Sequence, residues 1–148
     1  MTRARRMDPV VRAVGHDERE HAARLAECGQ RVADAEQRLA ELEKYQADYA
    51  SGLHSRTAAG ISATEMRDFR AFLARLSEAV RTQQRLLAQA RAEHEAAREA
   101  WRRAAQRARS IDHVVERWQA EERIHRERRE QIDIDERALQ LTRARTRH

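Results

Sequence analysis

Two long runs of heptad-spaced apolar residues, separated by a single turn signal, constrain the fold of this chain most. We call the residues that this spacing places on one helix face the seam positions. From Val11 to Leu53 ten of the thirteen seam positions are apolar, and from Met66 to Trp118 fourteen of the sixteen are apolar. Residues three and four apart share one face of an α-helix, so each run predicts a helix with one apolar stripe. The sequence therefore predicts an all-α fold, in which the two helices form a long antiparallel coiled coil, or α-hairpin.

The turn between the two runs carries three signals within seven residues. Gly60 lacks a Cβ and can take the left-handed conformation that ends a helix. Ser62 and Glu65 have the spacing of a capping box at the start of the next helix. Ile61 and Met66 can close around that cap as a hydrophobic staple. We expect the chain to reverse here.

The boundaries of the first helix follow from similar signals. Asp8 suits an N-cap and Pro9 the first helical position, because proline lacks an N–H that is unpaired there in any case. We expect one coiled-coil domain over residues 1–148. It would comprise a first helix of about 9–53, a turn of about 54–61 and a second helix of about 63–141.

The composition excludes several classes of protein. Charged residues make up 37% of the chain and aromatic residues 4%, with four glycines and one proline, which is too little turn punctuation for a compact α/β or all-β domain. Cys28 is the single cysteine, so neither an internal disulfide nor a cysteine-based zinc site is expected. No signal peptide and no membrane span are evident. We expect a cytoplasmic protein whose membrane association is peripheral.

No catalytic motif is recognisable. His16 and Glu20 have a spacing that could hold a metal ion, but they lack a third ligand and fit helix-surface residues better. A thin pair of helices also offers no enclosed site from which water is excluded. We expect no enzyme activity, no cofactor and no metal.

Pairing the helices around the turn gives an approximate register. It places Tyr49 near Phe69 and Val11 near Ala108, so that residues from 111 onward extend as an unpaired overhang. Three apolar residues of this C-terminal overhang would then lack cover: Ile111, Val115 and Trp118. An exposed apolar stripe of this kind indicates a partner-binding surface or a site of self-association.

Two aromatic residues should meet on one flank of the pair. Tyr45 and Phe72 each come directly before a seam position, at heptad position g. In an antiparallel pair of helices the g positions of the two helices face each other. The flanking aromatics either broaden a thin seam or anchor a partner, since aromatic residues dominate interface hot spots. The strip continues through four further residues: Leu42, Tyr49, Leu76 and Ala79.

Three sequence features resemble the FliJ family of flagellar type III export components. They are L-x-x-Y-x-x-x-Y at residues 42–49, G-I-S at 60–62 and F-x-x-F-L-x-x-L at 69–76. The resemblance covers roughly residues 8 to 140. It implies an antiparallel coiled coil similar to the central stalk of rotary ATPases.

The resemblance also implies partners and binding surfaces. The chain would insert into the hexameric export ATPase and promote its assembly or activity, bind the cytoplasmic domain of the membrane export gate, and escort export chaperones. The gate-binding patch would be the strip around Tyr45 and Phe72, although Arg38 and Gln83 depart from the family pattern at its outer ends. The free helix ends would enter the ATPase ring, with contacts from Val11, Val14, Leu25, Trp101, Ile111, Val115 and Trp118.

Three alternatives remain open at the level of sequence. The chain could be the equivalent stalk of a virulence-type injectisome, or a purely structural rod. It could also bind nucleic acid, since its net charge is +5 and four arginines cluster without acids at Arg102, Arg103, Arg107 and Arg109. We favour the export stalk without nucleic acid as a partner, and expect a monomer in isolation.

Overall fold

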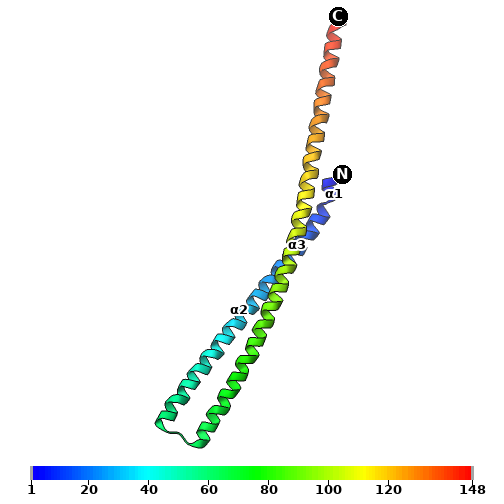
Figure 1. Cartoon of the computed structure of the whole chain (residues 1–148). Helices are drawn as coiled ribbons and strands as arrows, with labels where there is room; N and C mark the ends of the chain where they lie inside the picture. The colour runs from blue at the N-terminus through cyan, green and yellow to red at the C-terminus, as the bar shows by residue number, and fades with distance from the viewer. Residues whose placement is uncertain (1, 148) are drawn as a thin grey trace. The chain divides into compact units, whose positions relative to one another are not determined.

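The structure, a computed structural model, describes residues 2–147, and nearly all of them are helical. The elements in order are α1 (Arg3–Arg6), α2 (Asp8–Ala59) and α3 (Ala63–Thr146) (Figure 1). The described residues contain no β-strand. The predicted all-α fold is confirmed. Met1 and His148, the ends of the expected domain, lie outside the described residues, and the division into one domain stays a prediction.

The turn is shorter than the sequence predicted. α2 continues to Ala59, six residues past the expected end at Leu53, because no glycine or proline interrupts it there. The Thr57 hydroxyl donates a hydrogen bond of 2.8 Å back to the carbonyl of Leu53 within this extra length. Only residues 60–62 separate α2 from α3, and α3 runs to Thr146, five residues past its expected end.

The residues predicted to make the turn do so. Gly60 has a φ of +92°, in the left-handed region that the helix stop requires. The Ser62 hydroxyl oxygen accepts a hydrogen bond of 3.1 Å from the backbone N–H of Glu65, which caps the start of α3. The Ser62 half of the predicted capping box is therefore present at the start of α3.

Replacing Gly60 with alanine should lower the free energy of unfolding by about 1–2 kcal/mol, the cost of a left-handed conformation for a residue with a Cβ. Space is not the cause, since a Cβ at Gly60 would meet nothing within 4 Å. The same change at Gly52, which is helical and equally open, should stabilise the protein by up to about 1 kcal/mol. Urea unfolding followed by circular dichroism measures both. Effects of the same sign would contradict the conformational argument.

The chain forms two compact units, Glu20–Arg102 and the combination of Met1–Arg19 with Arg103–His148. Within the first unit, α2 and α3 lie side by side and antiparallel (Figure 1). All the predicted seam positions of this unit are buried or half-buried. The most buried of them are Cys28, Ala35, Leu76, Val80, Gln83, Leu87 and Ala97. The predicted coiled-coil seam is confirmed.

Polar residues in this seam are hydrogen-bonded across it. The buried Gln83 amide donates 3.2 Å to the carbonyl of Ala35 on α2. The Gln46 amide donates 2.8 Å to the hydroxyl of Ser77. Because a buried amide without a partner costs about 1–3 kcal/mol, these bonds let glutamine occupy seam positions.

The register around the turn agrees with the prediction. The rings of Tyr49 and Phe69 lie 5.0 Å apart, centroid to centroid. Further from the turn, Arg91 on α3 forms an ion pair of 3.3 Å with Glu36 on α2. In the predicted register these two residues are not level with each other, since Glu36 lies closer to the turn than Arg91 does. Side chains lean toward the N-terminus of their own helix, so in an antiparallel pair they lean toward each other. Long side chains therefore meet across an offset in level.

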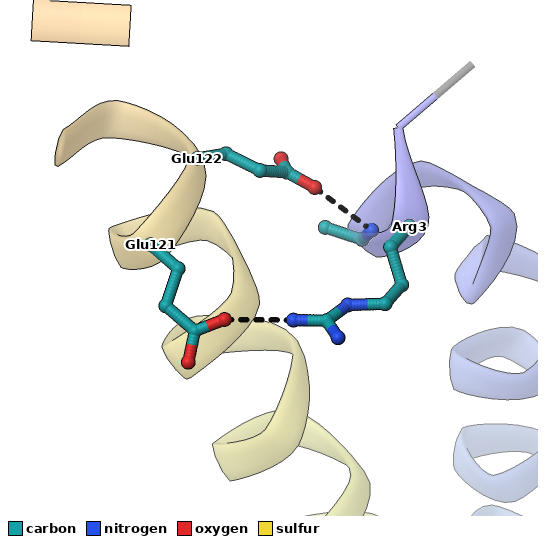
Figure 2. Close-up of polar contacts among 4 residues, drawn as sticks. Arg3, Glu121 and Glu122 are labelled. Carbon is teal, nitrogen blue, oxygen red and sulfur yellow. Dashed lines mark hydrogen bonds and ion pairs between the residues drawn. The ribbon is translucent and has the colours of Figure 1, made fainter. Parts of the chain in front are cut away.

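In the second unit the expected overhang is shorter than predicted. Ile111, Val115 and Trp118 are half-buried, not uncovered, because the N-terminal residues pack along this part of α3. The Arg3 guanidinium lies 4.2 Å from the ring centroid of Trp118. Arg3 forms an ion pair of 2.7 Å with Glu121 (Figure 2). The backbone N–H of Ala4 donates a hydrogen bond of 3.2 Å to the Glu122 carboxylate. The prediction of an unpaired helix from residue 111 is wrong.

The short helix α1 makes this cover possible. The Thr2 hydroxyl accepts a hydrogen bond of 3.2 Å from the N–H of Arg5 and caps α1 at its start. Met7 follows in a right-handed conformation, and its N–H donates 3.1 Å to the carbonyl of Ala4. Ala4 is 4% exposed against α3. The described residues beyond Glu122 are all exposed, so the overhang begins there.

Candidate partner-binding surface

Four aromatic side chains form one cluster beside the turn, which we call the aromatic cluster: Tyr45, Tyr49, Phe69 and Phe72. The rings of Tyr49 and Phe72 lie 4.4 Å apart, and those of Tyr45 and Phe72 lie 6.5 Å apart at 63°. These distances and angles are typical of attractive edge-on and tilted aromatic pairs. The expected meeting of Tyr45 with Phe72 is confirmed. Phe69 was predicted as a seam residue and was not included in the flank strip.

Exposure divides the predicted strip into an outer and an inner part. Tyr45 is 55% exposed, whereas Leu76 is 8% exposed and belongs to the seam. Leu42, Phe72 and Ala79 are half-buried, as is Tyr49. A partner that docks on this flank would therefore meet the Tyr45 ring first, and would reach Leu76 least.

Shallow hollows lie on both sides of Tyr45. The hollow toward the turn is about 320 Å³ and has Asp48, Tyr49 and Phe69 in its lining. The Arg56 guanidinium, which also lines it, lies 5.3 Å from the ring centroid of Phe69. The second hollow, about 380 Å³, is lined by Arg38, Glu41, Leu42, Tyr45 and Gln83. The exposed Tyr45 ring therefore lies between two hollows, and the lining of each hollow includes one acidic and one basic side chain.

The predicted ATPase-ring contacts occupy seam positions. Val11, Val14, Ile111, Val115 and Trp118 are half-buried in the unit that contains both chain ends. Leu25 and Trp101 are half-buried in the other unit. These side chains hold the helices together, so a partner would meet mainly their exposed edges.

One hollow opens onto the seam of the unit that contains the chain ends. It measures about 430 Å³ and is lined by Val14, Arg103, Gln106, Arg107, Ser110 and Ile111. Arg107 forms an ion pair of 3.0 Å with Asp17 beside it. This pairing reduces the positive charge that Arg107 would offer to a nucleic acid.

Comparison with protein families decides the chain's family. Residues 3–147 match the model of one family, described as "FliJ: Flagellar FliJ protein". The chain belongs to the FliJ family. It is thus a component of the flagellar type III export apparatus, as the resemblance in its motifs implied. Neither the curated proteins nor the solved structures compared with the chain gave a match.

The FliJ family is one of non-catalytic export components. Among residues 2–147 of this FliJ-family chain, no group of three or more histidine, cysteine, aspartate or glutamate side chains could hold a metal ion. Within the same residues, no helix has both the length and the apolar composition of a membrane span. The family match concerns flagellar proteins, so the flagellar interpretation is preferred over an injectisome stalk.

Sequence reasoning missed two features of this surface. Arg56 was assigned to the turn, although α2 continues through it and brings its guanidinium onto Phe69. The cover of Trp118 by Arg3 was also missed, because the first helix was expected to begin only at about residue 9. Thr2, an N-cap residue directly before Arg3, is the signal that could have indicated α1.

Proposed function

We propose that this chain is a non-catalytic stalk and adaptor of the flagellar export apparatus. Its aromatic cluster would bind the cytoplasmic domain of the export gate. The unit with both chain ends would contact the hexameric export ATPase and promote its assembly or activity. Peripheral association with the inner membrane and the escort of export chaperones belong to the same proposal. Membership of the FliJ family and the geometry of the aromatic cluster support it.

The exposure of Tyr45 carries the gate-binding part of this proposal. A tyrosine that served only to widen the seam would gain by covering its ring, but Tyr45 is 55% exposed. The Tyr45 ring packs against Phe72, which in turn packs against Tyr49, and all three stand on helices, so little conformational entropy is lost when a partner binds. Tyrosines with these properties are common binding hot spots. The hollows beside the ring fit apolar side chains of a partner.

Replacing Tyr45 or Phe72 with alanine should weaken binding to the purified gate cytoplasmic domain by about 30-fold or more, as expected for a hot spot of about 2 kcal/mol. Isothermal titration calorimetry measures the dissociation constants. Leu76 is a poor choice for this test, because it is buried and its truncation would disturb the seam.

Leu86→Ala provides the matched control. Leu86 is 49% exposed, close to the exposure of Tyr45, but lies two heptads beyond Phe72 on α3. Its replacement should change gate binding by less than about twofold, within the scatter of neutral surface substitutions. Stimulation of the export ATPase, assayed alongside, should be unaffected by Tyr45→Ala. Unchanged gate binding by both aromatic variants would rule out this site.

A further inference from the structure

The C-terminal part of α3 carries most of the exposed large apolar side chains of the described chain. Five of the eight such residues follow Glu122, and their exposed fractions run from 50% to 68%. They are Ile124, Ile132, Ile134, Leu139 and Leu141. The described residues place no second helix beside this segment, so its exposed apolar side chains form a surface on which another helix can pack.

Part of this apolar surface forms a stripe at coiled-coil spacing. The exposed residues Ile124, Ile134, Ala138 and Leu141 share one side of α3, and the half-buried Ala120 precedes them on the same side. Glu127 and Gln131 occupy the two middle positions of the same stripe.

The stripe does not continue the face of Trp118 that α1 covers. Trp118 and Ile124 are six residues apart, a rotation of about 240° around the helix. α1 packs over Trp118, whereas Ile124 is 50% exposed. The stripe is therefore available to another helix without displacement of α1.

The charges of the same segment fall into two adjacent blocks of opposite sign. Residues 123–129 contain four arginines and one glutamate. Residues 130–136 contain four acids and no base. The two blocks have equal length and meet between Arg129 and Glu130. If a second copy of the chain packs antiparallel about that point, the basic block of each copy lies beside the acidic block of the other.

We infer that this segment pairs antiparallel with the same segment of a second copy of the chain, about a two-fold axis near Arg129. Two independent features give the same centre. Packing Ile124 against Ile134 of the second copy centres the axis at Arg129, and opposing the charge blocks centres it between Arg129 and Glu130. A parallel pair would instead place like-charged blocks side by side, which is unfavourable.

The middle layer of the pair is polar and can be satisfied. The same axis places Glu127 opposite Gln131 of the second copy. The Gln131 amide uses one N–H for Asp135, at 3.1 Å, and has a second N–H that can donate to the Glu127 carboxylate. Such polar layers set the register and orientation of coiled coils at some cost in stability.

The small number of apolar layers makes the dimer weak and reversible. The inference replaces the expectation of a monomer at high concentration and does not rest on the proposed binding of the export gate. Sedimentation equilibrium of the full chain at about 5–500 μM, a range suited to micromolar dissociation constants, should show a monomer–dimer equilibrium. A monomer at every concentration overturns the inference.

Ile134 and Ile132 form a matched pair for this test, because each is 57% exposed and only Ile134 lies in the stripe. Ile134→Asn should raise the dissociation constant tenfold or more. Ile132→Asn should change it by less than twofold. Equal effects of the two substitutions would overturn the assignment of the interface.

Disulfide trapping tests the orientation. A Glu127→Cys chain mixed with a Gln131→Cys chain should yield mainly the mixed disulfide under mild oxidation. Arg126→Cys mixed with Asp133→Cys is the control, since these residues lie level with each other across the same axis but on the far side of the helix. Cys28 can stay, because it is 1% exposed. Predominant Glu127→Cys or Gln131→Cys homodimers, or equal trapping in the control, would exclude the antiparallel pair.

Discussion

Leu87→Ala should lower the free energy of unfolding by about 2–4 kcal/mol, whereas Leu86→Ala should change it by less than about 0.5 kcal/mol. The two leucines are neighbours on α3 but point in different directions. Leu87 is 6% exposed in the seam, and Leu86 is 49% exposed on the flank. Truncating Leu87 loses the burial of its side chain and leaves a cavity beside α2, while truncating Leu86 changes only a solvated surface.

Urea unfolding followed by helical circular dichroism provides this measurement. The two variants are a sensitive test of the seam, because both replace a helical leucine with alanine and so change composition and helix propensity equally. A core only two helices thick can relax around a cavity more easily than a globular core, which favours the lower end of the range. Equal destabilisation by the two substitutions would contradict the register in which α2 and α3 pack.

The sequence predicts such a seam well, because burial between two helices depends on local spacing. The heptad frame identified Ala35 and Leu87 as seam positions, and it included Gln83 despite its polarity. Gly60 and Ser62 were also predictable, since glycine stops and serine caps depend on residues close in sequence. The aromatic contact of Tyr45 with Phe72 followed from the same register.

Other features depend on information that local spacing lacks. The end of α2 at Ala59 was missed because the end of an apolar stripe does not end a helix; a breaker such as Gly60 does. The exposure of Tyr45 and the burial of Leu76 within one predicted strip depend on how closely the helices approach. The contact of Arg3 with Trp118 joins residues far apart in sequence. Local spacing cannot predict it, because a small error in the pairing register near the turn grows with distance from the turn.

Trp118→Ala should detach the N-terminal residues from α3 and raise the amide exchange rates of residues 4–14 by about tenfold to 100-fold, equivalent to about 1.4–2.7 kcal/mol of local stability. We expect the indole to make the largest contribution to this contact. Its half-buried ring loses packing on truncation, and the stacked Arg3 guanidinium adds about 0.5–1 kcal/mol. The Arg3–Glu121 ion pair contributes less, because its side chains are 56% and 64% exposed and water screens their charges.

Hydrogen–deuterium exchange separates these contributions when Trp118→Ala is compared with Trp118→Phe and Glu121→Gln. Trp118→Phe keeps an aromatic face under Arg3 and should raise the exchange rates much less than alanine does. Glu121→Gln removes only the exposed ion pair, and should raise them by less than about threefold. The Ala4 amide is the most direct reporter, because its N–H donates to Glu122 across the contact. If Glu121→Gln released residues 4–14 as fully as Trp118→Ala, the charge pair and not the indole would hold α1 against α3, and the order of these energies would be reversed.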